Sequence, residues 1–279
     1  MAKRRRFDLK KSLFLLPNMI TLSSIFCGFD SMRVSASAQH EEDYYLAALL
    51  IVFAMFFDML DGRVARATKT QSAFGLQIDS LADVLSFGAA PAMLVYQWTL
   101  RRLDTGRVPI GLIVSFIFVA CAAIRLARFN VIAMGEQKPS KTFVGLPTPG
   151  GAGILVSIIV ANHAASGVLG GVEYVWPLLV ITLGLSFLMV SSVRFRSFKD
   201  VRLNARSVLF VTFAVGSSAV ISYQTKPQFV LVWLLGCYVL VGIFESLWQL
   251  PGRLRARALA QGVDGSSHPP PGPPSPPPL

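Results

Sequence analysis

Four aspartates in one short stretch are the residues best suited to chemistry. Asp58, Asp61, Asp79 and Asp83 follow one long apolar run and precede another. A carboxylate near a bilayer costs at least a few kcal/mol unless it faces protein, water or a cation. With about 3.6 residues per turn, Asp58 and Asp61 share a helix face, and Asp79 and Asp83 share a face of the next helix. The spacing therefore predicts two acidic faces that converge across a short linker.

Convergent carboxylates predict a divalent metal site. Without four nearby cations the four acids would repel one another, and all-oxygen ligands select hard ions such as Mg²⁺ or Mn²⁺. The predicted metal ligands are Asp58, Asp61, Asp79 and Asp83.

The residues between the acids fit a phosphate ligand. Gly62 and Ala65 remove side-chain bulk on the acidic face, which lets a polyanion approach the backbone. Arg63, Arg66 and Lys69 add positive charge beside the metals. Metal-bound carboxylates bordered by cations are suited to holding a diphosphate.

The whole stretch resembles the signature of the CDP-alcohol phosphatidyltransferases, D-x2-D-G-x2-A-R-x8-G-x3-D-x3-D. The defined positions are met by Asp58, Asp61, Gly62, Ala65, Arg66, Gly75, Asp79 and Asp83. The resemblance implies transfer of a phosphatidyl group from CDP-diacylglycerol to an alcohol, with release of CMP and with two divalent ions. It implies that Asp83 is the base that accepts the proton of the incoming hydroxyl. It also implies CDP-diacylglycerol contacts for Gly62, Ala65, Arg66 and Gly75.

Further segments resemble the phosphatidylserine synthase branch of that family. The LPN-x-x-T segment suggests Asn18 and Thr21 as further residues of the CDP-diacylglycerol pocket, although Pro17 is also typical of the first turn of an interfacial helix. The RLARFN segment and the FxGLPxP segment extend the resemblance along the chain. This branch implies L-serine as the acceptor. The motif alone fits glycerol 3-phosphate, inositol phosphate or choline as well.

Arg125 and Arg128 are candidates for holding the acceptor. They lie three residues apart on one helical face, and an arginine fork can bind a carboxylate or a phosphate with two hydrogen bonds. Arginines that only extend toward the membrane interface would look the same in the sequence.

The composition is that of a membrane protein. Of 279 residues, 53% are hydrophobic and only 15% are charged, too apolar for an ordinary soluble domain of this length. The three cysteines lie in apolar runs with no metal-binding spacing. We predict an all-α, polytopic integral membrane helical bundle of about eight transmembrane helices. The expected spans are 13–32, 44–67, 78–99, 109–130, 148–164, 174–193, 206–223 and 228–249.

The positive charge indicates membrane orientation rather than nucleic-acid binding. The net charge is +11, and basic residues clustered at span ends are typical of anionic headgroups and topology. With eight spans and a cytoplasmic N-terminus, 21 of the 26 Lys and Arg residues face the cytoplasm. We therefore expect a protein of the cytoplasmic (inner) membrane whose active site faces the cytoplasm.

Three regions are expected along the chain. Residues 1–12 form a basic juxtamembrane leader, residues 13–250 the membrane-embedded domain, and residues 251–279 a basic and then proline-rich tail without a fold of its own. The expected partners are CDP-diacylglycerol, L-serine and the lipid bilayer; a homodimer is left open.

Two other function classes use intramembrane acids. A cation-coupled transporter would carry them in both halves of the chain, whereas here the acids lie in one stretch near one membrane face. A metal-dependent lipid phosphatase would use similar carboxylates with water as the attacking group. Product formation with and without serine distinguishes the phosphatase from the transferase.

Overall fold

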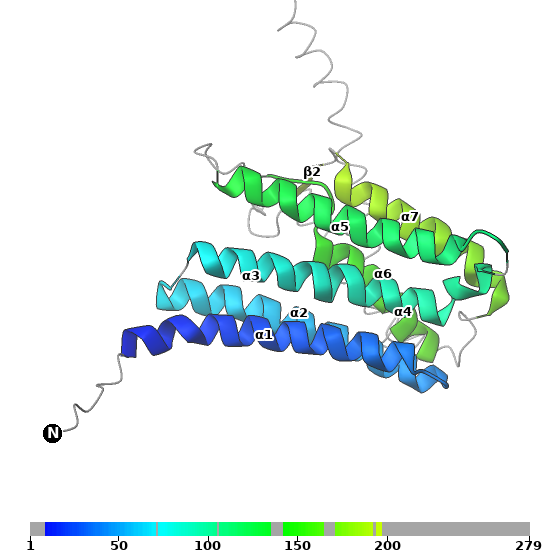
Figure 1. The fold of residues 1–279 in the computed structure, drawn as a ribbon, viewed down its shortest axis with the longest axis horizontal. Helices are drawn as coiled ribbons and strands as arrows, with labels where there is room; N and C mark the ends of the chain where they lie inside the picture. The colour runs from blue at the N-terminus through cyan, green and yellow to red at the C-terminus, as the bar shows by residue number, and fades with distance from the viewer. Residues whose placement is uncertain are drawn as a thin grey trace, which may run out of the picture.

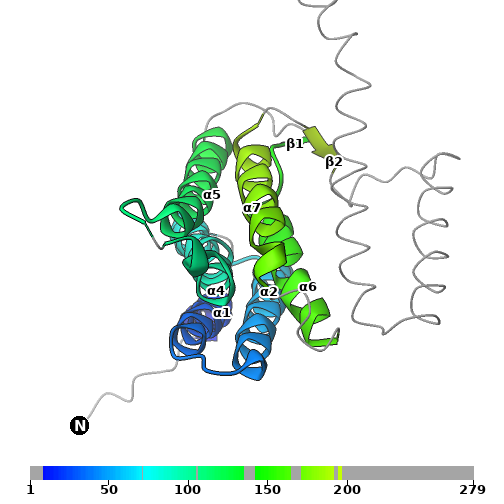
Figure 2. The ribbon, with the colours of Figure 1, turned by 90° about the vertical axis from the view of Figure 1, so that its right-hand side faces the viewer.

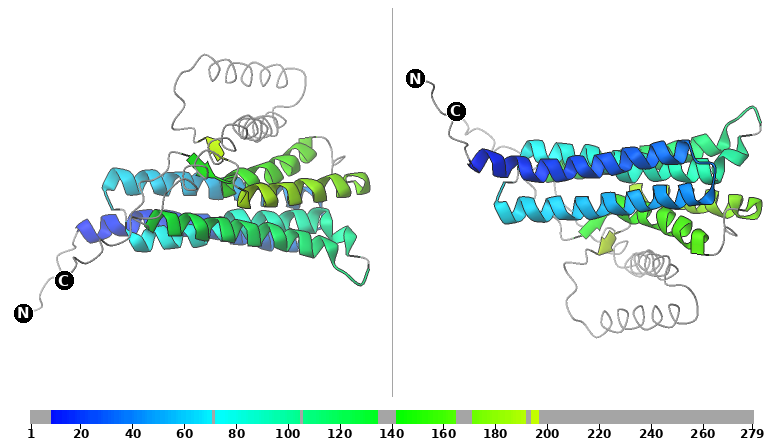
Figure 3. Two further views of the ribbon diagram at one scale, coloured as in Figure 1. Left: turned by 90° about the horizontal axis from the view of Figure 1, so that it is seen from above. Right: turned by 90° about the horizontal axis from the view of Figure 1, so that it is seen from below.

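The computed structural model is a bundle of α-helices with one short pair of β-strands. It describes residues 9–70, 72–104, 106–134, 142–164, 171–191 and 194–196. The long helices run along one common axis (Figures 1 and 3). In chain order the elements are α1 (Leu9–Ala36), α2 (Glu41–Thr68), α3 (Ala73–Asp83), the π-helical segment η1 (Val84–Ala89), α4 (Ala90–Trp98), the 3₁₀ segment η2 (Leu100–Leu103), α5 (Ile110–Met134), β1 (Thr142–Val144), α6 (Thr148–Ala164), the 3₁₀ segment η4 (Val172–Tyr174), α7 (Val175–Val190) and β2 (Arg194–Arg196).

The described helices are those of an integral membrane protein. By length and composition, four segments could cross a membrane: Glu41–Thr68, Ala73–Trp98, Ile110–Val131 and Val172–Val190. Large apolar side chains point outward from several helices, and the following are more than half exposed: Phe26, Phe29, Phe53, Phe116 and Phe187. An apolar outer surface is expected where lipid is the solvent.

The helix boundaries differ from the predicted spans at a few places. α1 begins at Leu9, within the segment predicted as a leader, and α3 begins at Ala73, before the span expected from residue 78. α6 has 17 residues. The predicted spans 206–223 and 228–249 lie outside the described residues, as does the tail 251–279.

α1 and α2 form an antiparallel pair joined by a tight turn. Asp43, in the first turn of α2, caps the start of the helix: its carboxylate accepts hydrogen bonds from the backbone N–H groups of Gln39 and His40 at 2.9 and 3.0 Å. Farther along, Ser31 Oγ donates to the Ala47 carbonyl at 2.8 Å, and Ser24 Oγ donates to the carbonyl of the buried Ala54 at 3.1 Å. Small residues and hydroxyls of this kind let helices approach closely where lipid supplies little hydrophobic drive.

A π-helical segment interrupts the third long helix directly after Asp83. Pro91 has no backbone N–H, and in a regular helix its ring would collide with the carbonyl four residues earlier. The chain adapts in η1 by widening the turn, and the Ala90 N–H bonds to Leu85 O, five residues back. The predicted single span at 78–99 is thus one helix with a widened turn in its middle, and that turn follows the last of the four acids.

The widened segment packs tightly against α1. Ser86 Oγ donates to the Ser24 carbonyl at 3.0 Å. A Cβ added to Gly28 would lie 2.7 Å from Ser86 Oγ and 2.8 Å from Ser86 Cα. Gly28 therefore sets the distance between α1 and the helix that carries Asp79 and Asp83.

The second half of the described chain places α6 and α7 beside α2 and α5 (Figure 2). β1 pairs with β2 in antiparallel register, Phe143 opposite Phe195. Neither strand is among the elements predicted from the sequence. Next to the strands, the start of α6 is tied to the end of α7, because the Leu146 N–H donates to the Leu188 carbonyl at 3.0 Å.

We expect Gly28→Ala to destabilise the protein, by about 1–3 kcal/mol, because the added methyl group forces the α1 and η1 backbones apart. Gly184→Ala is the matched control, since nothing lies within 4 Å of its added Cβ and alanine favours a helix by about 1 kcal/mol over glycine. Thermal unfolding in detergent, followed by far-ultraviolet circular dichroism, measures both. Equal shifts in the two variants would contradict the packing described here.

Candidate active site

The end of α2 and the start of α3 bring three of the predicted acids together. Carboxylate oxygens of Asp58, Asp61 and Asp79 all lie within 4.8 Å of one another. Asp58 and Asp61 lie one turn apart on α2, and Asp79 comes from α3. The expected convergence of two acidic faces is therefore present for these three residues.

A short turn makes this convergence possible. α2 ends at Lys69, which adopts a left-handed conformation with φ of 55° and is the only non-glycine residue with positive φ in the described chain. Its N–H bonds back to the Arg66 carbonyl, as in helix ends that usually carry glycine. Three residues later Ser72 begins α3, and its Oγ accepts the Gly75 N–H at 2.9 Å. The chain thus reverses within a few residues and lays Asp79 beside Asp61.

Asp61 is held from a third helix. It is 4% exposed, and its Oδ2 accepts a hydrogen bond from Thr21 Oγ1 of α1 at 2.6 Å. Thr21 Oγ1 also lies 3.1 Å from the Pro17 carbonyl, one turn earlier. The resemblance to LPN-x-x-T suggested Thr21 for the nucleotide pocket, and here its hydroxyl orients a carboxylate.

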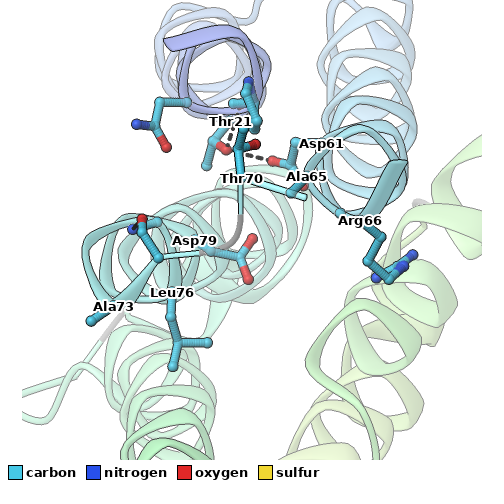
Figure 4. Close-up of a pocket in the computed structure, with 13 residues that line it drawn as sticks. Thr21, Asp61, Ala65, Arg66, Thr70, Ala73, Leu76 and Asp79 are labelled. Carbon is cyan, nitrogen blue, oxygen red and sulfur yellow. Dashed lines mark hydrogen bonds between the residues drawn. The ribbon is translucent and has the colours of Figure 1, made fainter. Parts of the chain in front are cut away.

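A cavity of about 490 Å³ opens beside Asp61 and Asp79 (Figure 4). It lies between α1, α2 and α3, and all six residues suggested for CDP-diacylglycerol binding line it: Asn18, Thr21, Gly62, Ala65, Arg66 and Gly75. At Gly75 the lack of a side chain leaves space in the cavity, because an added Cβ would lie only 3.2 Å from Ser72 Oγ and 3.7 Å from Asn18 Oδ1. The lining also includes Thr70 and Ser72, which the motif did not single out.

Asp83 lies outside the group of three. It follows Asp79 by one turn, and its side chain is within hydrogen-bonding reach of Asp58. Its Oδ1 is buried and has no hydrogen-bond partner among the described residues. Asp83 does not line the cavity. A buried carboxylate oxygen without a donor is costly, which suits an atom that meets a cation or a proton during function.

The two predicted arginines have different surroundings. Arg125 of α5 is half-buried, its charge acts on Asp83, and its Nη1 donates to Thr148 Oγ1 at 2.9 Å. Arg128 is exposed. Thr148 lies in the FxGLPxP segment, but nothing in the sequence predicts its hydrogen bond with Arg125.

A scan against protein-family models matches residues 14–189 to the CDP-alcohol phosphatidyltransferase model. The chain belongs to the CDP-alcohol phosphatidyltransferase family. The match covers the cavity, the acids and Arg125, and it confirms the resemblance drawn from the motif. The helical bundle described above is therefore the architecture of a member of this family.

Several curated relatives of this phosphatidyltransferase are named CDP-diacylglycerol–serine O-phosphatidyltransferase. The one from Helicobacter pylori is 37% identical over 236 residues, which are 85% of this chain and 92% of that protein. The one from Mycobacterium leprae is 29% identical over 253 residues, 89% of this chain and 81% of that protein. The one from Bacillus subtilis is 32% identical over 184 residues, 66% of this chain and 91% of that protein.

The residues of the site fit a divalent metal, on which the family generally depends. The donor set consists of carboxylate oxygens, which hard cations prefer. The ion pair found among the described residues, Arg33 with Asp30, involves none of the four acids; Arg66 and Arg125 lie near enough for their charges to act on Asp61 and Asp83. The partnerless Oδ1 of Asp83 adds a further oxygen beside Asp58.

We expect Thr21→Val to weaken metal binding about tenfold or more, because a group that orients a ligand typically contributes that much to metal affinity. Mn²⁺-dependent thermal stabilisation of the protein measures the effect without relying on activity. Thr182→Val is the matched control, since Thr182 is also a buried helical threonine that donates to a backbone carbonyl, but on α7. The same Mn²⁺ dependence in both variants would exclude this role for Thr21.

Proposed function

We propose that this chain transfers the phosphatidyl group of CDP-diacylglycerol to the hydroxyl of L-serine, giving phosphatidylserine and CMP. The observation that carries the proposal is the group of three carboxylates beside a cavity of about 490 Å³, in a chain whose curated relatives are named for this reaction. The cavity is lined by small residues and one arginine next to the acids, which suits a diphosphate.

In this proposal Asp58, Asp61 and Asp79 hold the metal, with Asp83 as a further ligand. Two Mg²⁺ or Mn²⁺ ions, when bound, would neutralise the diphosphate and the charge that develops on the leaving CMP. Thr21 keeps the Asp61 carboxylate in place through its 2.6 Å hydrogen bond. Charge-neutralising groups fixed before the reaction are the most effective catalysts of such transfers.

The CDP part of the donor would lie in the cavity. Gly62 and Ala65 leave room on the acidic face of α2, and Gly75 leaves room on α3. Asn18 offers an amide for hydrogen bonding from α1, and Arg66 offers positive charge at the rim.

Asp83 is the proposed base. The serine hydroxyl oxygen forms a bond to the phosphorus that carries the diacylglycerol, and the bond from that phosphorus to the CMP oxygen breaks. The hydroxyl proton passes to the Asp83 carboxylate, whose buried oxygen lacks a donor among the described residues. A base must lie within hydrogen-bond reach of the proton it takes, so the serine hydroxyl must reach the Asp83 carboxylate.

Arg125 is the proposed group for the acceptor carboxylate. Of the two candidate arginines it is the half-buried one and the one whose charge acts on Asp83. A carboxylate bound there would keep the serine hydroxyl within a side chain's length of the base. Arg128, being exposed, is better suited to the membrane interface.

We also propose the wider arrangement of the protein. Eight spans with a cytoplasmic N-terminus agree with the distribution of Lys and Arg along the chain, and the cavity then opens to the cytoplasm from the inner membrane. Residues 13–250 form the membrane domain, between the leader 1–12 and the tail 251–279. CMP could leave and serine enter without crossing the bilayer.

We expect Asp61→Asn and Asp79→Asn to lower CMP release by about 100-fold or more, because each variant loses a charged ligand in the charge-stabilising site. Asp30→Asn is the matched control, since Asp30 pairs with Arg33 outside the site. The assay uses purified protein, CDP-diacylglycerol, L-serine and Mn²⁺ or Mg²⁺. A chelator should abolish wild-type activity and either ion should restore it; full activity of either site variant would refute the shared metal site.

We expect Arg125→Lys to raise the KM for serine about tenfold while the KM for CDP-diacylglycerol changes little, because lysine keeps the charge but loses the two-pronged fork. Arg128→Lys is the control at the exposed neighbouring position. Steady-state CMP release over a range of each substrate separates the two constants. An equal rise in both would assign Arg125 to the diphosphate, and a preference for glycerol 3-phosphate would change the acceptor.

A further inference from the structure

Thr148, in the second half of the bundle, contacts Arg125 through its hydroxyl group. Arg125 Nη1 donates to Thr148 Oγ1 at 2.9 Å, and Thr148 is completely buried. The charge of Arg125 also acts on Asp83. The guanidinium is therefore hydrogen-bonded to the first residue of α6 while its charge acts on the proposed base.

Thr148 itself is held in a rigid position. The turn before it contains Gly145 with φ of 85°, where any Cβ would overlap the Met189 carbonyl oxygen of α7. Leu146 is fully buried, and its N–H donates to the Leu188 carbonyl at 3.0 Å. These two contacts with the end of α7 thus fix the start of α6, where Thr148 lies.

The next turn of α6 is fixed in the same way. A Cβ on Gly151 would overlap Met189 Cε and lie 3.8 Å from Phe118 Cε2 of α5. Thr148 Oγ1 therefore stands at a set point relative to α5, on which Arg125 is carried.

An arginine recognises a carboxylate through the orientation of its planar fork. Fixing one Nη nitrogen limits rotation of the whole plane, and less conformational entropy is lost when the ligand binds. Loss of that hydrogen bond would leave the guanidinium plane less constrained near the Asp83 carboxylate, whose opposite charge attracts it. Thr148 thus opposes a rearrangement that would remove the acceptor's binding group.

We propose that Thr148 is a positioning residue that orients the Arg125 guanidinium for the carboxylate of the acceptor, and so sets the preference for an amino acid over an amino alcohol. The inference rests on the proposed function and deepens it by naming what selects the acceptor.

The test compares Thr148→Val with Thr148→Ser, using L-serine and ethanolamine as acceptors. Loss of the hydroxyl in Thr148→Val should raise the KM for serine about tenfold, since a hydrogen bond to a charged group is lost. The KM for CDP-diacylglycerol and any turnover of ethanolamine, which has no carboxylate, should stay within about twofold. Thr148→Ser keeps the hydroxyl and should behave as the wild type. Ser157→Ala, which removes another buried hydroxyl of α6, is the control for packing.

Two further measurements decide the matter if Thr148→Val fails to fold. Thr148→Ala removes the hydroxyl without inserting a methyl group against Arg125 and should show the same selective rise in KM. In an Arg125→Lys background, either Thr148 substitution should add less than about twofold, because coupled residues are not additive.

Several outcomes would overturn the inference. They are an unchanged KM for serine in Thr148→Val or Thr148→Ala, a loss shared equally by serine and CDP-diacylglycerol, and a failure of Thr148→Ser to restore the wild-type constant. In these cases the wild-type enzyme still uses serine and the proposed function stands. A wild-type protein that releases no CMP with serine would overturn the proposed function and this inference together.

Discussion

Carboxylates brought within 4.8 Å of one another repel, and at a membrane interface they also lose hydration. The fold must hold Asp58, Asp61 and Asp79 together against both effects until a cation neutralises them. Three local features hold them. The left-handed conformation of Lys69 lets the chain reverse between α2 and α3, and the Ser72 hydroxyl caps the start of α3. Thr21 donates a hydrogen bond to Asp61 from α1. Because these carboxylates lie closer to one another than a stable unneutralised group allows, a divalent cation is their natural partner.

The helices that carry the acids are themselves located by small residues and hydroxyls rather than by large apolar side chains. Ser24 and Ser31 bond to carbonyls of α2, and Ser86 bonds to a carbonyl of α1. In lipid these contacts supply distance and register, because burying a leucine against another helix gains little over burying it in acyl chains. The large side chains on the outer surface, such as Phe116 and Phe187, can therefore face the bilayer. Close backbone packing is what turns a bundle of apolar helices into a frame with a fixed site.

Much of the site could be predicted from the sequence because its residues are close along the chain. A period of 3.6 residues and a linker of a few residues suffice to bring Asp58, Asp61 and Asp79 together, and the helical architecture follows from the apolar runs. Other features depend on contacts between distant segments. Arg125 and Arg128 look alike in the sequence, three residues apart on one face, yet the packing of other helices against α5 leaves one half-buried and the other exposed. The pairing of β1 with β2 joins residues fifty or more positions apart, and a strand of three residues is too short to show a strand pattern in the sequence. Pro91 is a local sequence feature that favours the widened turn η1, but it indicates such a turn only if the helix is known to continue through the proline.

α5 connects the two parts of the proposed site. Near its end Asn130 Nδ2 donates to Ser80 Oγ, on the residue that follows Asp79, at 2.9 Å, and five residues earlier Arg125 donates to Thr148 of α6. The helix therefore contacts the element that carries the acids and the element that orients the arginine. In-line transfer needs the donor phosphorus and the acceptor hydroxyl to be held relative to each other, not merely bound. In the proposed reaction the donor lies in the cavity between α1, α2 and α3, and the acceptor carboxylate at Arg125. α5, which bonds to Ser80 and to Thr148, would then hold the two substrates relative to each other.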